Sequence, residues 1–334
     1  MTNIPKHPIL KTDPALILWL LDSDPAIRWQ VMRDISGASA DEISAERARV
    51  ASEGFGNQLL KMQQPDGSWA GEAWNQGCNS TYHVLTLLRE MGLDPTSSEA
   101  QKAIDKVREQ VKWRGWDWDG NWLGWEVMGN PFFAGEVEPC INGQVGAAGA
   151  YFGQDIERVI DWLLKGQLAD GGWNCEAENG STRSSFNSTI CVLEGLLEYE
   201  TVSVDGAWVR EARQHGEEYL LERQLFHRLS TGEVLERDRW DQTAFTHFGF
   251  PTWWHYDVLR GLDYLRKAGV TPDERMAKAI ELVSSRRIAD GFWLNEVNYP
   301  GEMPIEIDAG EGQPSKWNTL RALRVLNWYF EGGG

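Results

Sequence analysis

The sequence predicts an all-α protein in which six helical hairpins close into a single (α/α)6 toroid domain over residues 1–334. A phrase ending in Asp-Gly-x-Trp occurs three times, and each copy ends an amphipathic segment and precedes a more apolar one. The copies are Gln63–Trp69, Gln167–Trp173 and Arg287–Trp293. A repeated unit of this kind cannot bury its apolar face alone, so its copies are expected to pack side by side. No strand-like alternation of useful length interrupts the helical pattern.

The helices are expected to form two layers. Charged amphipathic segments with one wet face predict the outer layer, at 14–22, 44–63, 97–111, 155–167, 207–224 and 273–287. More apolar segments predict the inner layer and begin near Asp24, Asn79, Asn142, Asn187, Trp254 and Lys316. The alternative is an open solenoid, which requires polar terminal repeats, and the last pair is no more polar than the others.

The starts of the inner helices carry recognisable signals. Asn79-Ser80-Thr81 and Asn187-Ser188-Thr189 are nearly the same phrase, and both suit a helix N-cap. The third inner helix is rich in Gly and Ala between 143 and 150, which predicts close helix approach and room for a cavity.

The connections from outer to inner helices are long, and in a closed ring they all open at one end. They cover residues 64–78, 112–141, 168–186, 225–253 and 288–316. Long loops that carry Trp, Gly and acidic residues are usually functional. We therefore expect the active site at this rim. The Asp of each repeat phrase (Asp66, Asp170 and Asp290) is expected to be a turn residue.

The composition of the chain makes some classes of partner and location less favourable. With 32 basic and 50 acidic residues the net charge is −18, which disfavours nucleic acid and anionic membranes as partners. No apolar run has the length of a transmembrane span, and the polar start of the sequence does not resemble a signal peptide. The four Cys residues form no CxxC pair. These features predict a cytoplasmic protein with reduced thiols that pack or bind metal, acting on a small-molecule substrate.

The Asp-Gly-x-Trp phrases and the helix pairing resemble the QW-like repeats of the squalene cyclase and protein prenyltransferase β-subunit superfamily. The resemblance implies the toroid fold and a terpenoid type of substrate. Triterpene cyclases have two barrels and an acidic DxDD motif that protonates the substrate. This chain has room for one barrel, and its nearest match, Asp117-Trp118-Asp119-Gly120, lacks the pair of adjacent Asp residues.

Protein prenyltransferases hold zinc with a D-x-C pair that opens one inner helix and a His that opens a later one. Glu138, Cys140 and His255 are similar to that set in residue type and helix-end placement, with Glu in place of Asp. Cys175, in the next loop, adds a further metal ligand of a type that zinc prefers. The alternative is that Cys140 and His255 only pack or cap. The sequence is silent on whether a partner subunit is required.

Other candidates lie on the same rim. Asp117, Asp119 and Glu138 are the candidate acid/base residues. Asp117 and Asp119 alternate with Trp residues, which are expected to raise the pKa of a neighbouring carboxyl as a general acid needs, although both also suit turn positions. The candidate substrate walls are Trp118, Trp122, Trp254 and Tyr256. Arg183, Arg260 and Arg321 are candidate anchors for an anionic group; the alternative is internal ion pairing with Asp257, Asp263 or Glu194.

Three classes of function stay open at this point. The first is an enzyme of the superfamily that acts on an apolar or ring-shaped substrate by acid/base or zinc-assisted chemistry. The second is a carbohydrate-active (α/α)6 hydrolase or lyase that uses two rim carboxylates. The third is a non-catalytic binding protein. A P-loop and a GxSxG elbow are both missing from the sequence.

Overall fold

The computed structural model describes residues 13–116, 122–203, 206–237 and 244–331 and is predominantly helical. The chain forms two compact units. The first unit comprises Met1–Glu46, Glu217–Tyr299 and Glu306–Gly334, and the second comprises Arg47–Gly216 and Pro300–Ile305. The all-α prediction is confirmed at the level of helical content. The closure of the hairpins into one toroid domain stays a prediction.

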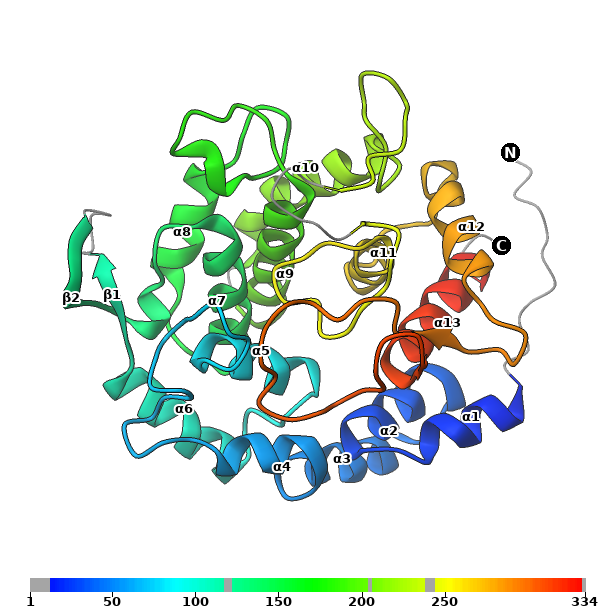
Figure 1. The fold of residues 1–334 in the computed structure, drawn as a ribbon, viewed down its shortest axis with the longest axis horizontal. Coiled ribbons are helices and arrows are strands. Elements are labelled where there is room, and N and C mark those ends of the chain that lie inside the picture. Colours follow the sequence, from blue (N-terminus) through cyan, green and yellow to red (C-terminus); the bar gives the residue numbers. More distant parts are fainter. Residues whose placement is uncertain (1–12, 117–121, 204–205, 238–243, 332–334) are drawn as a thin grey trace. The chain divides into compact units, whose positions relative to one another are not determined.

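The second unit alternates outer and inner helices in the predicted order (Figure 1). Outer helices α4 and α8 pack on inner helices α5, α7 and α9, and α6 packs on α4. The elements that begin in this unit are η2 (Arg49–Ala51), α4 (Gly54–Lys61), α5 (Thr81–Glu90), α6 (Ser98–Gln110), β1 (Lys112–Trp116), β2 (Trp122–Pro131), η3 (Phe132–Ala134), α7 (Pro139–Tyr151), α8 (Glu157–Lys165), η4 (Cys175–Ala177), α9 (Phe186–Val202), η5 (Gly206–Val209) and α10 (Arg210–Glu222).

Helices α7 and α9 pack directly against each other through glycine. A Cβ atom on Gly143 would lie 2.4 Å from the Cys191 carbonyl oxygen, and one on Gly195 would lie 2.4 Å from the Gly143 carbonyl oxygen. Both distances are shorter than any real Cβ contact, so only glycine permits this helix spacing. The small residues of the third inner helix therefore serve close helix approach, as the sequence predicted.

Two local expectations are wrong in this unit. The connection 112–141 was expected to be a loop, but Lys112–Trp116 and Trp122–Pro131 form the antiparallel strands β1 and β2, in which Gly115 pairs with Gly124 and the register is irregular. The sequence of these strands does not alternate apolar and polar residues regularly, so it gives no period-two signal. The expected outer helix 44–63 is also interrupted, because Gly54 adopts a left-handed φ of 60° between η2 and the rest of α4.

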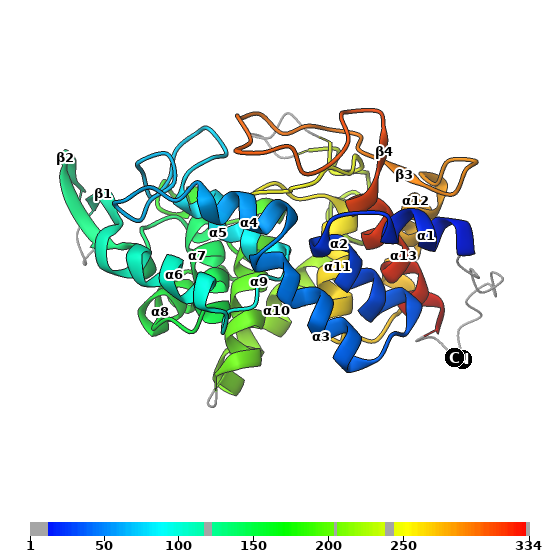
Figure 2. The same ribbon diagram turned by 90° about the horizontal axis from the view of Figure 1, so that it is seen from below.

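The first unit repeats the two-layer pattern. Inner helix α13 contacts α2 and α11, and outer helices α1 and α12 pack against α2 and α11 respectively. Strands β3 and β4 lie at one end of α13 (Figure 2). The elements are α1 (Pro14–Leu21), α2 (Pro25–Val31), η1 (Met32–Ser36), α3 (Ala40–Ala48), α11 (Val258–Lys267), η6 (Glu274–Met276), α12 (Ala277–Ser285), β3 (Trp293–Leu294), β4 (Pro314–Ser315) and α13 (Lys316–Glu331).

The three repeat phrases share one hydrogen-bond pattern that joins an outer helix to the next inner helix. Each Trp is at most 2% exposed. Its indole N–H donates to a carbonyl at the end of the outer helix, and its backbone N–H donates to a Thr hydroxyl at the start of the inner helix. The Trp–carbonyl–Thr sets are Trp69–Leu59–Thr81, Trp173–Leu163–Thr189 and Trp293–Val283–Thr319. The repeat therefore has a structural role: its Trp forms a hydrogen-bonded joint between the outer helix and the next inner helix.

Two of the repeat Asp residues, Asp66 and Asp170, accept hydrogen bonds from nearby backbone N–H groups. Asp66 accepts from the backbone N–H of Ser68 at 3.0 Å, as expected for a turn residue. Asp170 instead accepts from the backbone N–H of Ser184 at 3.2 Å, which ties the loop back to the turn.

Replacement of the Thr hydroxyl in this joint tests its energetic role. Thr189→Val is expected to destabilise the protein by about 1–3 kcal/mol, because the Trp173 backbone N–H would be buried without an acceptor. The measurement is urea unfolding. Thr86→Val is the matched control, since the buried Thr86 hydroxyl only donates to the Tyr82 carbonyl of its own helix. Equal losses in the two variants would contradict the role of the joint.

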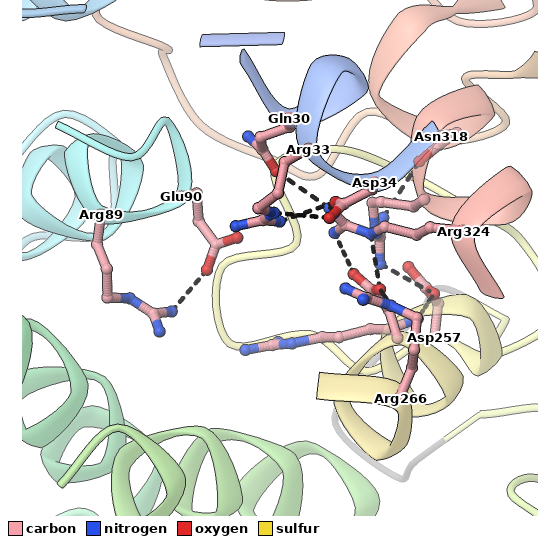
Figure 3. A network of polar contacts seen from close by, with 12 residues as sticks. Gln30, Arg33, Asp34, Arg89, Glu90, Asp257, Arg266, Asn318 and Arg324 are labelled. Atoms are coloured by element: carbon pink, nitrogen blue, oxygen red, sulfur yellow. Dashed lines mark hydrogen bonds and ion pairs between the residues drawn. The ribbon is translucent and has the colours of Figure 1, made fainter. Parts of the chain in front are cut away.

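Arg324 lies in a buried ion-pair network of the first unit (Figure 3), and it pairs with Asp263 and with Asp34. Arg324 Nε donates to Asp263 Oδ1 at 2.7 Å, and Arg324 Nη1 donates to the Gln30 side chain at 3.0 Å. Burial would raise the pKa of Asp263, but the charges of Arg324 and Arg266 hold it well below its usual range. The network therefore pairs the charges that α11 and α13 bring into the core.

Asp308 provides a pH-dependent contribution to stability. It accepts from the Lys316 backbone N–H at the start of α13 and from the Ser315 hydroxyl, and burial raises its pKa to about 6. The folded chain thus holds the proton more tightly than the unfolded chain. This contribution is complete below about pH 4 and is lost as the pH rises to about 6.

Asp308→Asn is therefore expected to remove a specific pH dependence. The stability of the wild type relative to this variant should fall by about 2 kcal/mol between about pH 4 and pH 6.5. Urea unfolding of both proteins across this range gives the difference directly. Parallel stability profiles would show that Asp308 does not titrate differently in the folded chain.

Candidate metal site

The start of α7 positions the first two donors. Glu138 is the N-cap residue, Pro139 occupies the first helical position, and Cys140 follows it. Proline suits this position because its fixed φ matches the helix and its missing N–H would have no helical partner. Glu138 and Cys140 are thereby held on adjacent backbone with restricted freedom. The sequence prediction that Glu138-Pro139-Cys140 opens the third inner helix is confirmed.

Cys175 is positioned by the loop that leads to α9. It begins the short helix η4, and the Asn174 side chain caps that helix by accepting from the Glu176 backbone N–H at 2.9 Å. Ser188, on the first turn of α9, accepts from the Cys175 backbone N–H at 3.1 Å and donates to Cys175 Sγ at 3.3 Å. The close packing of α7 and α9 therefore brings Cys140, at the start of α7, near the loop that carries Cys175.

These three side chains converge on one point in the second unit. Cys140 Sγ lies 2.9 Å from Cys175 Sγ and 3.7 Å from Glu138 Oε2. One donor atom from each of the three residues lies within 4.8 Å of the other two. Among the described residues, this is the group of Cys, His, Asp and Glu side chains with metal-binding spacing. Cys140 is buried, Cys175 is half-buried and Glu138 is exposed at the edge.

The electrostatics of the cluster disfavour negative charge while no cation is present. The hydrogen bond to Cys175, followed by burial, raises the pKa of Cys140 well above its usual value. Desolvation of its carboxylate raises the pKa of Glu138, and repulsion from Glu178 and Glu176 adds to the effect. A divalent cation reverses this balance, because it stabilises the thiolates and the carboxylate together.

The donor chemistry fits zinc better than a hard cation. Two thiols and one carboxylate match the ligand types of zinc, whereas magnesium and calcium prefer a shell of oxygen donors. A set of three protein donors is typical of catalytic zinc, which keeps a fourth position for water or substrate.

His255 and Trp254, both predicted from the sequence to belong to the site, lie in the first unit. The His255 ring is stacked between Trp254, with centroids 3.8 Å apart, and Tyr299, with centroids 4.0 Å apart. The cluster of the second unit is formed without His255. That His255 joins the ligand set, and that Trp254 forms a substrate wall, stay predictions.

The other predicted residues of the first unit have structural partners. The buried Tyr256 hydroxyl donates to the Leu225 carbonyl at 2.8 Å. Arg260 donates to the carbonyls of Trp253 and His255 at 2.9 and 2.6 Å. Arg321 Nη2 lies 3.6 Å from Asp257 Oδ1, so the internal ion pair that the sequence offered as an alternative is present. Substrate contacts by these three residues stay predictions.

The remaining candidates belong to the second unit. Arg183 is exposed, and its carbonyl accepts from the Asn174 side chain at 2.7 Å in the loop that carries Cys175. Trp122 begins β2, and its side chain lies outside the described part of the chain, as do Asp117, Trp118 and Asp119 altogether.

Two features of the site were not singled out from the sequence. Ser188 was read only as part of an N-cap phrase, yet its hydroxyl contacts Cys175. A buried polar layer also lies one helical turn from Cys140 along α7, where Gln144 contacts Arg89. Arg89 also pairs with Glu90 (Figure 3) and with Glu194 at 3.7 Å. The sequence predicts Glu194 as a partner of other arginines, and the structure pairs it with Arg89 instead.

No family model and no curated protein matches this chain. Among solved structures, it is similar to a protein from Actinoplanes, with 15% identity, 93% of this chain and 91% of the other covered, and a TM-score of 0.42. It is also similar to the type II terpene cyclase MstE from Scytonema, with 15% identity, 92% and 87% covered and a TM-score of 0.42. A variant of MstE in complex with geranylgeranyl dihydroxybenzoate gives a TM-score of 0.42 at 15% identity, with 92% and 86% covered.

In the described residues, no helix combines the length and the apolar character that a membrane crossing requires.

Proposed function

We propose that this protein is a metal-dependent enzyme that binds zinc through Glu138, Cys140 and Cys175 and acts on a small, apolar or ring-shaped substrate. The convergence of these three donors carries the proposal. The QW-like repeats support a substrate of the terpenoid type, by their resemblance to the squalene cyclase and prenyltransferase superfamily. Two facing thiols are not part of the two-carboxylate chemistry of glycosidases, which makes the carbohydrate alternative weaker.

Each side chain of the site has a role that follows from its position. Cys140 and Cys175 supply the two strong zinc ligands, and Glu138 closes the set from the exposed edge. Ser188 orients Cys175, because its hydroxyl accepts from the Cys175 backbone N–H and donates to the Cys175 sulfur. When bound, zinc supplies Lewis-acid chemistry and lowers the pKa of an attached nucleophile.

A second candidate mechanism is acid/base catalysis beside the cluster. Burial raises the pKa of Glu136 to about 7, and its carboxylate accepts from the Glu138 backbone N–H at 2.9 Å. A carboxyl with a pKa near neutrality is suited to proton transfer. In this mechanism Glu138 also serves as acid or base, beside the predicted donors Asp117 and Asp119.

Titration of the metal-free protein with Co²⁺ tests the proposal. Co²⁺ replaces zinc in such sites, and its bonds to thiolate sulfur give a near-ultraviolet charge-transfer absorption that carboxylate and imidazole ligands do not give. We expect saturation at one equivalent and reversal by zinc, with about half the sulfur absorption in Cys175→Ser. A titration without thiolate absorption would contradict the metal site and favour the acid/base mechanism.

A further inference from the structure

The two thiols of the candidate metal site are also placed to react with each other. Cys140 Sγ and Cys175 Sγ are 2.9 Å apart, whereas a disulfide bond is about 2.05 Å long. Closing this gap requires less than about 1 Å of side-chain movement. Both cysteines are free in the structure. Their backbones are held by α7 and by the Ser188 contact, so the pair stays together without a metal.

We propose that Cys140 and Cys175 form a reversible disulfide when a hydroperoxide oxidises them, and that this disulfide and zinc exclude each other. The oxidation itself needs no metal. The exclusion rests on the proposed zinc site, because the bond removes both thiolate ligands.

The solvent exposure of the two cysteines indicates which of them is oxidised first. Cys175 is half-buried and within reach of a small oxidant, whereas Cys140 is 8% exposed. Cys175 sulfur attacks the peroxide oxygen, the O–O bond breaks, and the products are Cys175 sulfenic acid and one molecule of alcohol or water. Cys140 sulfur then attacks Cys175 sulfur, the S–OH bond breaks, and the hydroxyl leaves as water with the Cys140 proton.

Reduction returns the pair to its starting state. Two equivalents of a small thiol attack the disulfide in turn, the first forming a mixed disulfide and the second releasing it, so that the reductant is oxidised to its own disulfide. The site would then bind metal again. The chain thereby gains a chemical control over its metal content through these two sulfur atoms.

Intact-protein and peptide mass spectrometry after hydrogen peroxide treatment tests the proposal. In metal-free wild type we expect the loss of two hydrogens and a Cys140–Cys175 cross-linked peptide, both reversed by dithiothreitol. Cys78→Ser should behave in the same way, because the Cys78 thiol donates to the Pro300 carbonyl away from the pair. Cys140→Ser should instead accumulate oxygen on Cys175, since the thiol that faces it at 2.9 Å has been removed.

These measurements test the disulfide separately from the proposed zinc site. Cross-linking in metal-free protein establishes the disulfide even if zinc binding fails. Protection of wild type by one equivalent of zinc, and loss of zinc binding in the oxidised protein, establish the mutual exclusion. Oxygen adducts on Cys175 with Cys140 still open to alkylation, or no modification of either residue, would overturn the disulfide. Oxidation at equal rates with and without bound zinc would overturn the exclusion.

Discussion

Cys140→Ala is expected to weaken zinc binding by more than about a hundred-fold. Loss of residues that merely orient zinc ligands costs roughly 10–100-fold in affinity, and Cys140 is itself a proposed ligand. Its thiol contacts both Cys175 and Glu138, so its removal leaves two donors without the sulfur that joins them. The affinity is measured by competition with a chromophoric chelator.

Cys78→Ala provides the control for this measurement. Cys78 is buried in the same unit, and burial raises the pKa of its thiol to about 11, but it is no member of the cluster. The control should bind zinc as the wild type does. His255→Ala belongs in the same series, since a weakened affinity would support the predicted fourth ligand. Equal affinities for Cys140→Ala and Cys78→Ala would contradict the proposed ligand set.

Gly143→Ala is expected to destabilise the protein by about 3 kcal/mol or more. The new methyl would lie 2.4 Å from the carbonyl oxygen of Cys191, and backbone cannot move aside as a flexible side chain can. The α7–α9 contact would have to open, which also displaces Cys140 from Cys175. We therefore expect a lower midpoint in urea unfolding together with weaker zinc binding.

Gly146→Ala is the matched control on the same helix. Its methyl would meet Val159 at 3.6 Å, an ordinary contact, and alanine favours helix by up to about 1 kcal/mol relative to glycine. This variant should be as stable as the wild type or more stable. If the two substitutions had the same effect, close packing of α7 on α9 would not be what sets the position of the site.

The fold was predictable from the sequence where periodicity and repeats were strong. Predicted inner helices start near the observed starts of α5, α9 and α13, because apolar residues at helical spacing must face a core. The pairing of β1 with β2 was missed because the sequence of these strands shows no regular alternation of apolar and polar residues. Ring closure depends on how hairpins pack over long range, and no local pattern specifies it.

The candidate site was predictable in its residue types but not in its contacts. Glu138, Cys140 and Cys175 were predicted because zinc-type donors occurred on neighbouring rim loops. Ser188 was missed, since an N-cap serine looks the same in sequence whether or not a thiol lies beside it. Arg260 was predicted to bind an anionic group, but its guanidinium donates to two backbone carbonyls in the loop before α11. The sequence does not reveal these partners, because they depend on how that loop folds.

The zinc content of the protein purified without chelator tests the central claim most directly. Elemental analysis should find about one zinc per chain in the wild type and in Cys78→Ala, and less than about a tenth of that in Cys140→Ala and Cys175→Ala. Wild-type protein that holds no transition metal, and takes up none when zinc is added under reducing conditions, would contradict the account.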